Sequence, residues 1–473
     1  MMKFSLLIFL LAAATLALAG VATVSEPDKS DILKAQATTL PEVSTSNVKG
    51  LVFDRFYQVW LENIDWEDSL VDENQEFFAK QGILLTNFYA VAHPSEPNYC
   101  ASAGGDTFGM DNDDFHQVPA NVSTVADLLD TKSISWAEYQ ASKNKPLSYP
   151  ASLLTRVFQE HLPYPGYQGY NYSNQQTYNP DYVRKHNPLV LYNSITSNDT
   201  RTRQIKNFTN FEDDLKNKKL PQWAFITPNM TNDAHDTNVT FGATWERMWM
   251  ERLLLDKYFS DNTVVLLTYD EDHTYTKRNR IFSVLVGGGI PDELRGTKDD
   301  TFYTHYSTIA TVSANWGLPS LGRWDCGANI FKLVADKTGY VNYDVEIERL
   351  RLNNTNPGPF SDNTYSKFSA DWPNPATEGD CSAGHGILDI VKKNFNGTKP
   401  SHNYTFPFPW DEKAEYNVNV TATRKVDGKK VDITSSSTST AAKASGSKGA
   451  ATVVLPGSAS LTGAFVAALA YFL

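Results

Sequence analysis

The stretch TVVLLTYDEDH, residues 263–273, decides the fold. Its first seven residues, Thr263–Tyr269, are apolar or β-branched without alternation, which is typical of a strand buried on both faces. Three acidic residues follow at once: Asp270, Glu271 and Asp272. Adjacent carboxylates repel one another unless a cation or water offsets their charge. The stretch therefore predicts a central strand that ends in a metal site, with a solvated acidic turn as the alternative.

Strands and helices alternate on both sides of this stretch. The sequence predicts strands at 53–61, 82–90, 134–139, 222–227 and 281–286. It predicts helices at 122–129, 244–258 and 305–315. Such alternation favours an α/β fold, a three-layer sandwich with helices on both faces of a central, mostly parallel sheet. Sites in these sheets lie at the carboxyl ends of strands. The irregular residues 340–416 are expected to wrap this core.

The composition excludes several classes of protein. Among 473 residues, 42 are Lys or Arg and 54 are Asp or Glu, a net charge of −12, and 12% are aromatic. These values exclude a disordered chain, a coiled coil and a collagen-like repeat, and the acidity argues against a nucleic-acid partner. Three cysteines are too few for a disulfide scaffold. Cys326 and Cys381 are the favoured pair, and Cys100 is expected to be a buried thiol.

Both ends of the chain carry targeting signals. Residues 1–19 have a positive start, an apolar run and a small-x-small cleavage site, as in a secretory signal peptide. Residues 20–50 form a polar extension, and the main folded domain is expected over 51–430. Residues 431–449 are expected to be a Ser/Thr-rich stalk, and 450–473 the hydrophobic tail of a GPI-anchor signal. We therefore expect a secreted protein at the cell surface or cell wall, attached to the membrane through a lipid anchor.

Many N-glycosylation sequons agree with secretion. We expect glycans at the following asparagines: Asn121, Asn171, Asn198, Asn207, Asn238, Asn353, Asn396, Asn403 and Asn419. Asn229 also lies in a sequon, within the polar cluster 228–236. We expect it to remain unmodified because it would lie at the functional site.

The segment HPSEPNY, residues 93–99, follows a predicted strand. Pro97 is tolerated in the first turn of a helix, so Ser95 would lie at a helix N-terminus, where free N–H groups favour an anion. A serine there could accept a phosphoryl group, and Asn98 could donate to a phosphoryl oxygen. The alternative is an ordinary N-cap serine.

Three more polar clusters follow predicted strands or begin a helix. Glu62 and Asn63 end the strand 53–61 and could offer oxygen ligands to a metal ion, or form a solvated turn. The cluster 228–236 brings together acids, amides and an imidazole, which suits metal binding or acid–base catalysis. His305 begins a predicted helix as a possible ligand or as a structural histidine.

In this order, the clusters resemble the fungal secreted acid phosphatases of the phosphoesterase family, within the alkaline-phosphatase superfamily. The resemblance covers residues 51–339. The matching stretches are Glu62-Asn63, HPSEPNY at 93–99, YVRKHNP at 182–188, FITPNMTNDAHD at 225–236, LLTYDED at 266–272 and FYTHYS at 302–307. The resemblance implies an alkaline-phosphatase-like fold for the catalytic domain, 51–430.

The resemblance also implies roles for the matched residues. Ser95 matches the nucleophile, and Asp233 and His235 match a catalytic loop that binds a further metal or handles the leaving group. The ligands of a divalent ion, of unspecified identity, would be Glu62, Asn63, Ser95, Asp270 and Glu271. Contacts to phosphate or proton transfer are implied for His93, Asn98, Arg184 with its neighbours Lys185 and His186, Asn229 and His305.

The expected activity is hydrolysis of organic phosphate monoesters through a metal-activated serine and a phosphoserine intermediate. A phospholipase C-like phosphodiesterase would use the same site. A third possibility is a non-catalytic cell-wall glycoprotein, although every proposed catalytic position carries a usable side chain.

Overall fold

Two parallel strands, β1 (Arg55–Leu61) and β7 (Thr263–Tyr269), form the middle of the central sheet. They pair along their whole length, from Arg55 with Thr263 to Leu61 with Tyr269. β6 (Trp223–Thr227) pairs with β1 on its other side, also in parallel. β6 and β7 are buried throughout and β1 almost throughout. Burial on both faces explains why 263–269 is apolar without alternation.

The structure is a computed structural model that describes residues 27–141, 162–169, 182–353, 358–361 and 371–436. All of these belong to one compact unit, 1–437. The expected signal peptide, the anchor tail at 450–473 and the sequon at Asn171 lie outside the described residues. Within the described ranges, no helix combines the length and apolar character needed to cross a membrane.

The central sheet has eight strands in the order β5-β4-β6-β1-β7-β8-β2-β9. Only the two pairs made by β8 are antiparallel, so the prediction of a mostly parallel sheet is confirmed. The strands not yet given are β2 (Ile83–Leu85), β3 (Phe88–Tyr89), β4 (Trp136–Gln140), β5 (Ile205–Asn207), β8 (Ser283–Val286), β9 (Thr297–Asp299), β10 (Tyr303–Thr304), β11 (Asp344–Val345), β12 (Thr421–Val426) and β13 (Lys429–Thr434).

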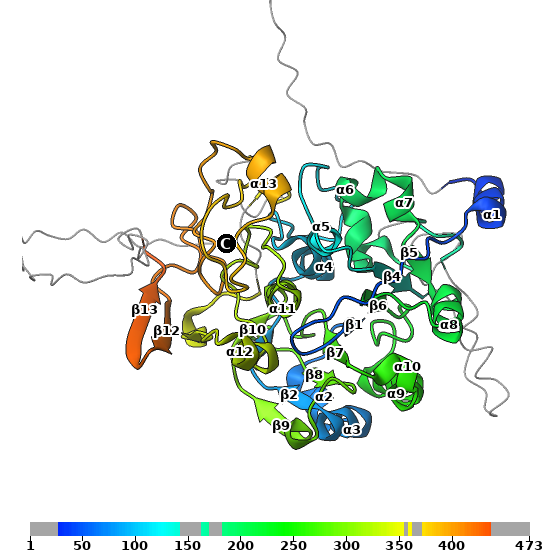
Figure 1. Ribbon diagram of the computed structural model, residues 1–473, viewed down its shortest axis with the longest axis horizontal. Helices are drawn as coiled ribbons and strands as arrows, with labels where there is room; N and C mark the ends of the chain where they lie inside the picture. Colours follow the sequence, from blue (N-terminus) through cyan, green and yellow to red (C-terminus); the bar gives the residue numbers. More distant parts are fainter. Residues whose placement is uncertain (1–26, 142–161, 170–181, 354–357, 362–370, 437–473) are drawn as a thin grey trace, which may run out of the picture. The chain divides into compact units, whose positions relative to one another are not determined.

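Helices lie on both sides of this sheet, as the α/β prediction requires (Figure 1). Their bounds are α1 (Lys29–Thr38), α2 (Trp66–Val71), α3 (Glu73–Gln81), α4 (Ser95–Gly104), α5 (Val125–Asp130), α6 (Asn193–Thr196), α7 (Asp199–Thr202), α8 (Phe208–Lys216), α9 (Val239–Leu255), α10 (Lys257–Ser260), α11 (Tyr306–Trp316), α12 (Lys332–Thr338) and α13 (Asp389–Asn394). α3, α9 and α10 pack together on one side, and α4 packs against α11 on the other.

Several boundaries differ from the expected ones, and the helix expected over 244–258 is divided into α9 and α10 at Asp256. The strand expected over 82–90 is divided into β2 and β3, and these short strands belong to different sheets. The first residues of the expected stalk, 431–449, are folded, because 429–434 is β13, an antiparallel partner of β12, and Ser435 is fully buried. The polar sequence of this hairpin resembles a stalk because both of its strands lie mainly at the surface.

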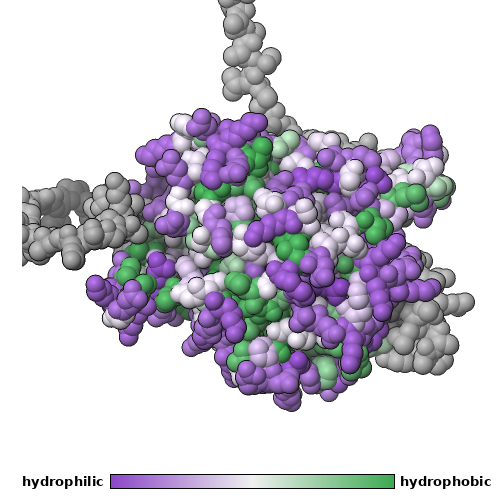
Figure 2. Space-filling view, in the orientation of Figure 1, coloured by the Kyte–Doolittle hydropathy of each residue, from purple (hydrophilic) through white to green (hydrophobic). Residues whose placement is uncertain are grey.

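The irregular region after α12 is tied to the core. A disulfide joins Cys326 to Cys381, the pair that the sequence favoured, and Cys100 is a buried free thiol. Buried aromatic residues of this region, among them Tyr404 and Phe406, join the main hydrophobic cluster. On the face shown in Figure 2, hydrophilic residues cover most of the surface and hydrophobic residues lie in separate patches.

Candidate active site

The carboxyl ends of β1, β6 and β7 meet at one fully buried residue, Glu62. Its Oε2 accepts a hydrogen bond from Ser95 Oγ at 3.0 Å. Its Oε1 accepts one from the phenol of Tyr99 and lies 3.2 Å from Nε2 of His186. Its backbone N–H donates to the carbonyl of Asp233, in the loop after β6, at 2.8 Å. Glu62 therefore connects a hydroxyl, an imidazole and a second acidic loop.

Ser95 is the first residue of α4, which confirms the predicted helix start. Its side chain is 1% exposed and lies where the unpaired N–H groups of the helix favour negative charge. Tyr99 follows one turn later on the same face, so both side chains reach Glu62. Sequence reasoning did not assign Tyr99, although its four-residue spacing from Ser95 was the available signal.

Asp270 and Asn63 lie beside Glu62 on the ends of β7 and β1. Asp270 Oδ1 accepts hydrogen bonds from the backbone N–H groups of Asn63 at 3.2 Å and Glu271 at 2.7 Å. With its amide nitrogen facing the carboxylates, Asn63 also donates to Glu62 Oε2 at 3.2 Å and to Asp270 Oδ1 at 3.1 Å. Asp270 Oδ2 is buried and has no hydrogen-bond partner. These contacts keep two carboxylates close together.

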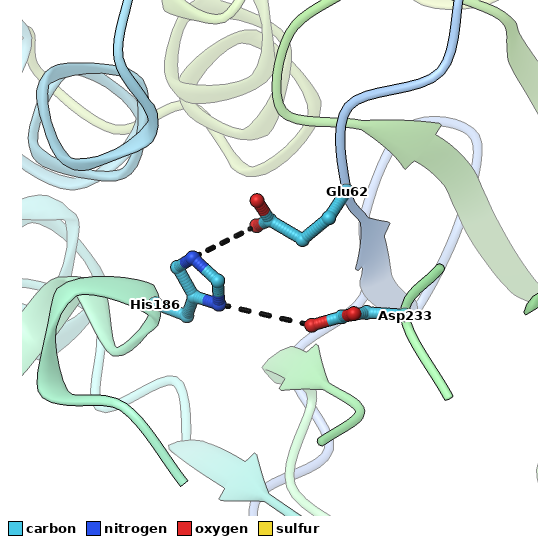
Figure 3. Close-up of side chains that lie close together, drawn as sticks. All are labelled: Glu62, His186 and Asp233. Atoms are coloured by element: carbon cyan, nitrogen blue, oxygen red, sulfur yellow. Dashed lines mark ion pairs between the residues drawn. The ribbon is translucent and has the colours of Figure 1, made fainter. Parts of the chain in front are cut away.

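Glu62, His186 and Asp233 form a candidate metal group (Figure 3). One ligand atom from each lies within 4.8 Å of those of the other two, and all three residues are buried. Figure 3 shows the imidazole of His186 between the two carboxylates, with Nδ1 lying 3.7 Å from Asp233 Oδ2. The donor set, two carboxylates and one imidazole, suits a divalent ion such as zinc or manganese.

The pKa values of these residues are consistent with a site that binds a cation. Burial, together with the charges of Asp270 and Asp233, holds the pKa of Glu62 well above its ordinary value. Burial also raises the pKa of Asp233 and of Asp270. Burial, with a smaller effect of Lys185, holds the pKa of His186 well below its ordinary value, so the ring is neutral and able to coordinate. A bound cation would offset the charge that this site concentrates.

Lys185, rather than Arg184, is the cation next to this cluster. The Lys185 ammonium is buried, pairs with Asp113 at 2.9 Å and offsets a small part of the rise that burial causes in the pKa of Glu62 and of Asp233. Arg184 was expected to contact phosphate. Its guanidinium instead donates to the carbonyls of His116 at 2.7 Å and Val190 at 3.3 Å, and it is fully buried. The two neighbours differ because consecutive side chains of a 3-10 turn point in different directions.

Glu271 was expected to be a metal ligand, but it lies outside the metal group. Its Oε2 lies 3.0 Å from Nδ1 of His93 and accepts a hydrogen bond from Asn98 at 3.2 Å. His93 also contacts Asp272, with Nε2 lying 3.3 Å from Oδ1. Burial lowers the pKa of His93, but the two carboxylates outweigh it and raise the value to about 9. His93 is therefore a charged partner of these acids.

Two residues expected to contact substrate hold the backbone around the site. The amide nitrogen of Asn98 donates to the carbonyl of Ala92 at 2.8 Å, and its oxygen accepts from the N–H groups of Val91 and Ala92. His305 is fully buried, stacks on Trp60 at 4.2 Å and lies with Nε2 2.6 Å from the carbonyl oxygen of Asp270. Burial lowers its pKa to about 3, so it is neutral.

The loop after β6 places its residues at different depths. Asp233 is fully buried, and its Oδ1 accepts from the backbone N–H of His235 at 2.9 Å. The side chain of His235 is 18% exposed and pairs with Asp236 at 2.9 Å. Its ring centroid lies 6.2 Å from that of His186, so it borders the cluster from the solvent side. Asn229 is 1% exposed, the most buried of the described sequon asparagines.

Comparison with known proteins agrees with these features. The sequence model of the Phosphoesterase family matches residues 72–319. An acid phosphatase of Aspergillus fumigatus is 67% identical over 416 residues, which cover 88% of this chain and 89% of that protein. A phosphate-repressible acid phosphatase of Penicillium chrysogenum is 56% identical over 86% of this chain and 93% of its own length.

More distant matches reach beyond fungi. A phosphatidylinositol-3-phosphatase of Mycobacterium tuberculosis is 27% identical and covers 52% of this chain and 69% of its own length. A solved structure from Vibrio parahaemolyticus, described as a protein in the alkaline phosphatase superfamily, has 13% identity and a TM-score of 0.35, and covers 60% of this chain and 73% of that one. The family match and the two fungal relatives confirm the resemblance drawn from the motifs: this chain belongs to the phosphoesterase family.

Proposed function

We propose that this chain is an acid phosphatase that hydrolyses phosphate monoesters with Ser95 as its nucleophile. The observation that carries the proposal is the Ser95 hydroxyl, which begins α4 and donates to Glu62 at 3.0 Å beside the candidate metal group. The fungal relatives named acid phosphatase support the choice of reaction.

Glu62, Asp233 and His186 are the residues that would hold a divalent ion, with Asn63 and Asp270 beside them. Such an ion, when bound, lowers the pKa of a neighbouring hydroxyl and offsets charge on phosphoryl oxygens. The Oδ2 atoms of Asp233 and Asp270 are buried and accept no hydrogen bond, which suits them as ligand atoms.

The side chains suggest how the reaction proceeds. Ser95 Oγ would attack phosphorus and form a phosphoserine as the bond to the ester oxygen breaks, with Glu62 Oε2 placed to accept its proton. The N-terminal N–H groups of α4 and the Lys185 ammonium would stabilise charge on the phosphoryl oxygens. We assign protonation of the leaving oxygen to His235, which borders the cluster and has a side chain that is 18% exposed. Water would then release phosphate.

Hydrolysis of a chromogenic phosphate monoester and of its diester tests the proposal. We expect the wild type to prefer the monoester, and Ser95→Ala to lose at least about a thousandfold in kcat, since it removes the nucleophile. Ser102→Ala is the matched control, because Ser102 lies on the same helix and its hydroxyl donates only to the carbonyl of Tyr99 at 2.8 Å. Ser102→Ala should keep the wild-type activity. A chelator should abolish the activity of both proteins.

Two other results would change the assignment. Preference for the diester would indicate a phospholipase C-like phosphodiesterase. Absence of turnover for both substrates would favour the non-catalytic cell-wall glycoprotein.

We also propose that the protein works outside the cell, at the surface. The signal-like residues 1–19 and the anchor-like tail 450–473 motivate this location. The disulfide between Cys326 and Cys381 fits an oxidising compartment. Exposed sequon asparagines, such as Asn121 and Asn419, are accessible to glycosylation.

A further inference from the structure

The segment 274–278, which follows the acidic end of β7, is anchored at several points. The backbone N–H and the hydroxyl of Thr274 donate to Asp65 at 2.9 Å and 2.7 Å. Lys277 pairs with Asp65 at 2.8 Å and with Glu67 at 2.7 Å. These contacts fix the segment to the residues that follow β1, the strand directly before Glu62.

Asn353 holds the same segment from a distant part of the chain. Its amide nitrogen donates to the carbonyl of Tyr275 at 2.7 Å and to the carbonyl of Lys277. Asn353 is also the first residue of a sequon completed by Thr355. A glycan on this nitrogen would replace one of its two hydrogens, so the glycan expected at Asn353 from the sequence and the pair of hydrogen bonds exclude each other.

Tyr275 presents an aromatic ring beside the site. One face of the ring stacks on His93, with centroids 4.0 Å apart and planes inclined by 23°. The residue is 56% exposed, so a large part of it remains accessible to a ligand. His93 in turn lies 3.0 Å from Glu271 and 3.3 Å from Asp272, so the ring of Tyr275 is one side chain away from the acidic end of β7.

We propose that Tyr275 binds the planar aromatic part of the leaving group, such as a nucleobase, and that the Asn353 amide positions Tyr275. This inference rests on the proposed function. An open aromatic face held by a histidine on its other side offers stacking without reorganisation. The substrate class is therefore monoesters whose alcohol carries an aromatic ring within reach of the phosphate.

Adenosine 5′-monophosphate and ribose 5-phosphate form a matched pair of substrates, because they share the reacting ester and differ in the base. Tyr275→Ala should raise KM for the nucleotide about three- to tenfold, with kcat and the ribose 5-phosphate constants within about twofold. Tyr275→Phe should behave as wild type because it keeps the ring. Equal losses for both substrates, or an unchanged KM for the nucleotide, would overturn the proposal.

Binding to a Ser95→Ala background gives a readout that does not need turnover. Calorimetric dissociation constants for the two compounds should show the same nucleotide-specific loss on Tyr275→Ala. If the wild type hydrolyses neither compound, the proposed function fails, whereas the dissociation constants still decide the role of Tyr275.

The positioning role of Asn353 has its own matched pair of variants. Asn353→Ala removes the amide and the sequon, and it should reproduce most of the nucleotide-specific rise in KM. Thr355→Ala removes only the sequon and should leave KM unchanged. If Thr355→Ala raises KM as much as Asn353→Ala does, a glycan rather than the amide holds the segment, and this part of the proposal is wrong.

Discussion

At the scale of single residues, the site depends on carboxylates that are buried before any cation is bound. Glu62, Asp233 and Asp270 are all fully buried and raise the cost of one another's charge. Buried charges are stable only when paired or coordinated. His186 provides a neutral nitrogen among them, as a metal group needs. The role of His186 as a metal ligand can therefore be tested by metal binding, separately from catalysis.

Replacing His186 by alanine should release the ion. We expect metal affinity to fall at least about 10- to 100-fold, because even residues that only support a ligand cost that much when removed. The metal content of the purified protein, measured by mass spectrometry after dialysis, is the readout. His116→Ala is the control, since His116 is also buried but pairs with Glu96 at 3.4 Å, outside the metal group. Full metal content in His186→Ala would remove His186 from the ligand set.

At the scale of elements, helix α9 carries a buried acid outside the site. Glu246 is 1% exposed and accepts a hydrogen bond from Gln75 of α3 at 2.9 Å. Burial raises its pKa from 4.5 in the unfolded chain to about 8. Since the folded value is the higher one, the stability it contributes is complete below pH 4.5 and is lost as pH rises through about 8.

Glu246→Gln should remove this pH dependence. In the wild type, the free energy of unfolding should fall by up to about 1.4 kcal/mol per pH unit across that window because of Glu246. The glutamine keeps an acceptor for Gln75 but does not ionise. Urea denaturation at several pH values between 4 and 8 measures the slope. Glu251→Gln, a change at a half-exposed acid on the same helix, is the control and should keep the wild-type slope. Parallel slopes for Glu246→Gln and wild type would contradict the prediction.

Local features of the sequence were predictable, and side-chain directions were not. The uninterrupted apolar run before Asp270 gave β7 with its observed bounds, and Pro97 indicated that a helix begins near Ser95. Neither Glu271 nor Arg184 could be placed from sequence. Each lies one residue from a residue of the cluster, and the side on which it packs depends on distant segments that supply His93 and Val190. The antiparallel direction of β8 likewise depends on residues 270–282, which return the chain beside β7 without crossing the sheet.

At the scale of the whole molecule, the sequon asparagines differ in their exposure to solvent. Asn238 is exposed at the start of α9, where its side chain accepts from the N–H of Phe241 at 3.0 Å. Asn229, nine residues earlier, is buried in the loop of the site. A bulky glycan requires an accessible side chain.

A glycopeptide map of the protein produced in its own cells should therefore distinguish these two positions. We expect a glycan at Asn238 and none at Asn229. Both sites are compared in one digest, in which the formerly glycosylated asparagines are labelled as the glycans are removed by an enzyme. Asn238 is the internal control because it shows that the region was reached by the glycosylation machinery. A glycan at Asn229 would mean that the loop after β6 is open when glycans are attached.

The pairing of β1 with β7 has a consequence for fragments of this protein. The two strands are neighbours over their whole length, yet Glu62 and Asp270 lie more than 200 residues apart in the chain. A product that stops before β7 lacks one of the two neighbours of β1 and also Asp270, one of the central acids. A polypeptide that contains only one half of this centre should therefore be inactive rather than partly active, since the centre is assembled from both halves at once.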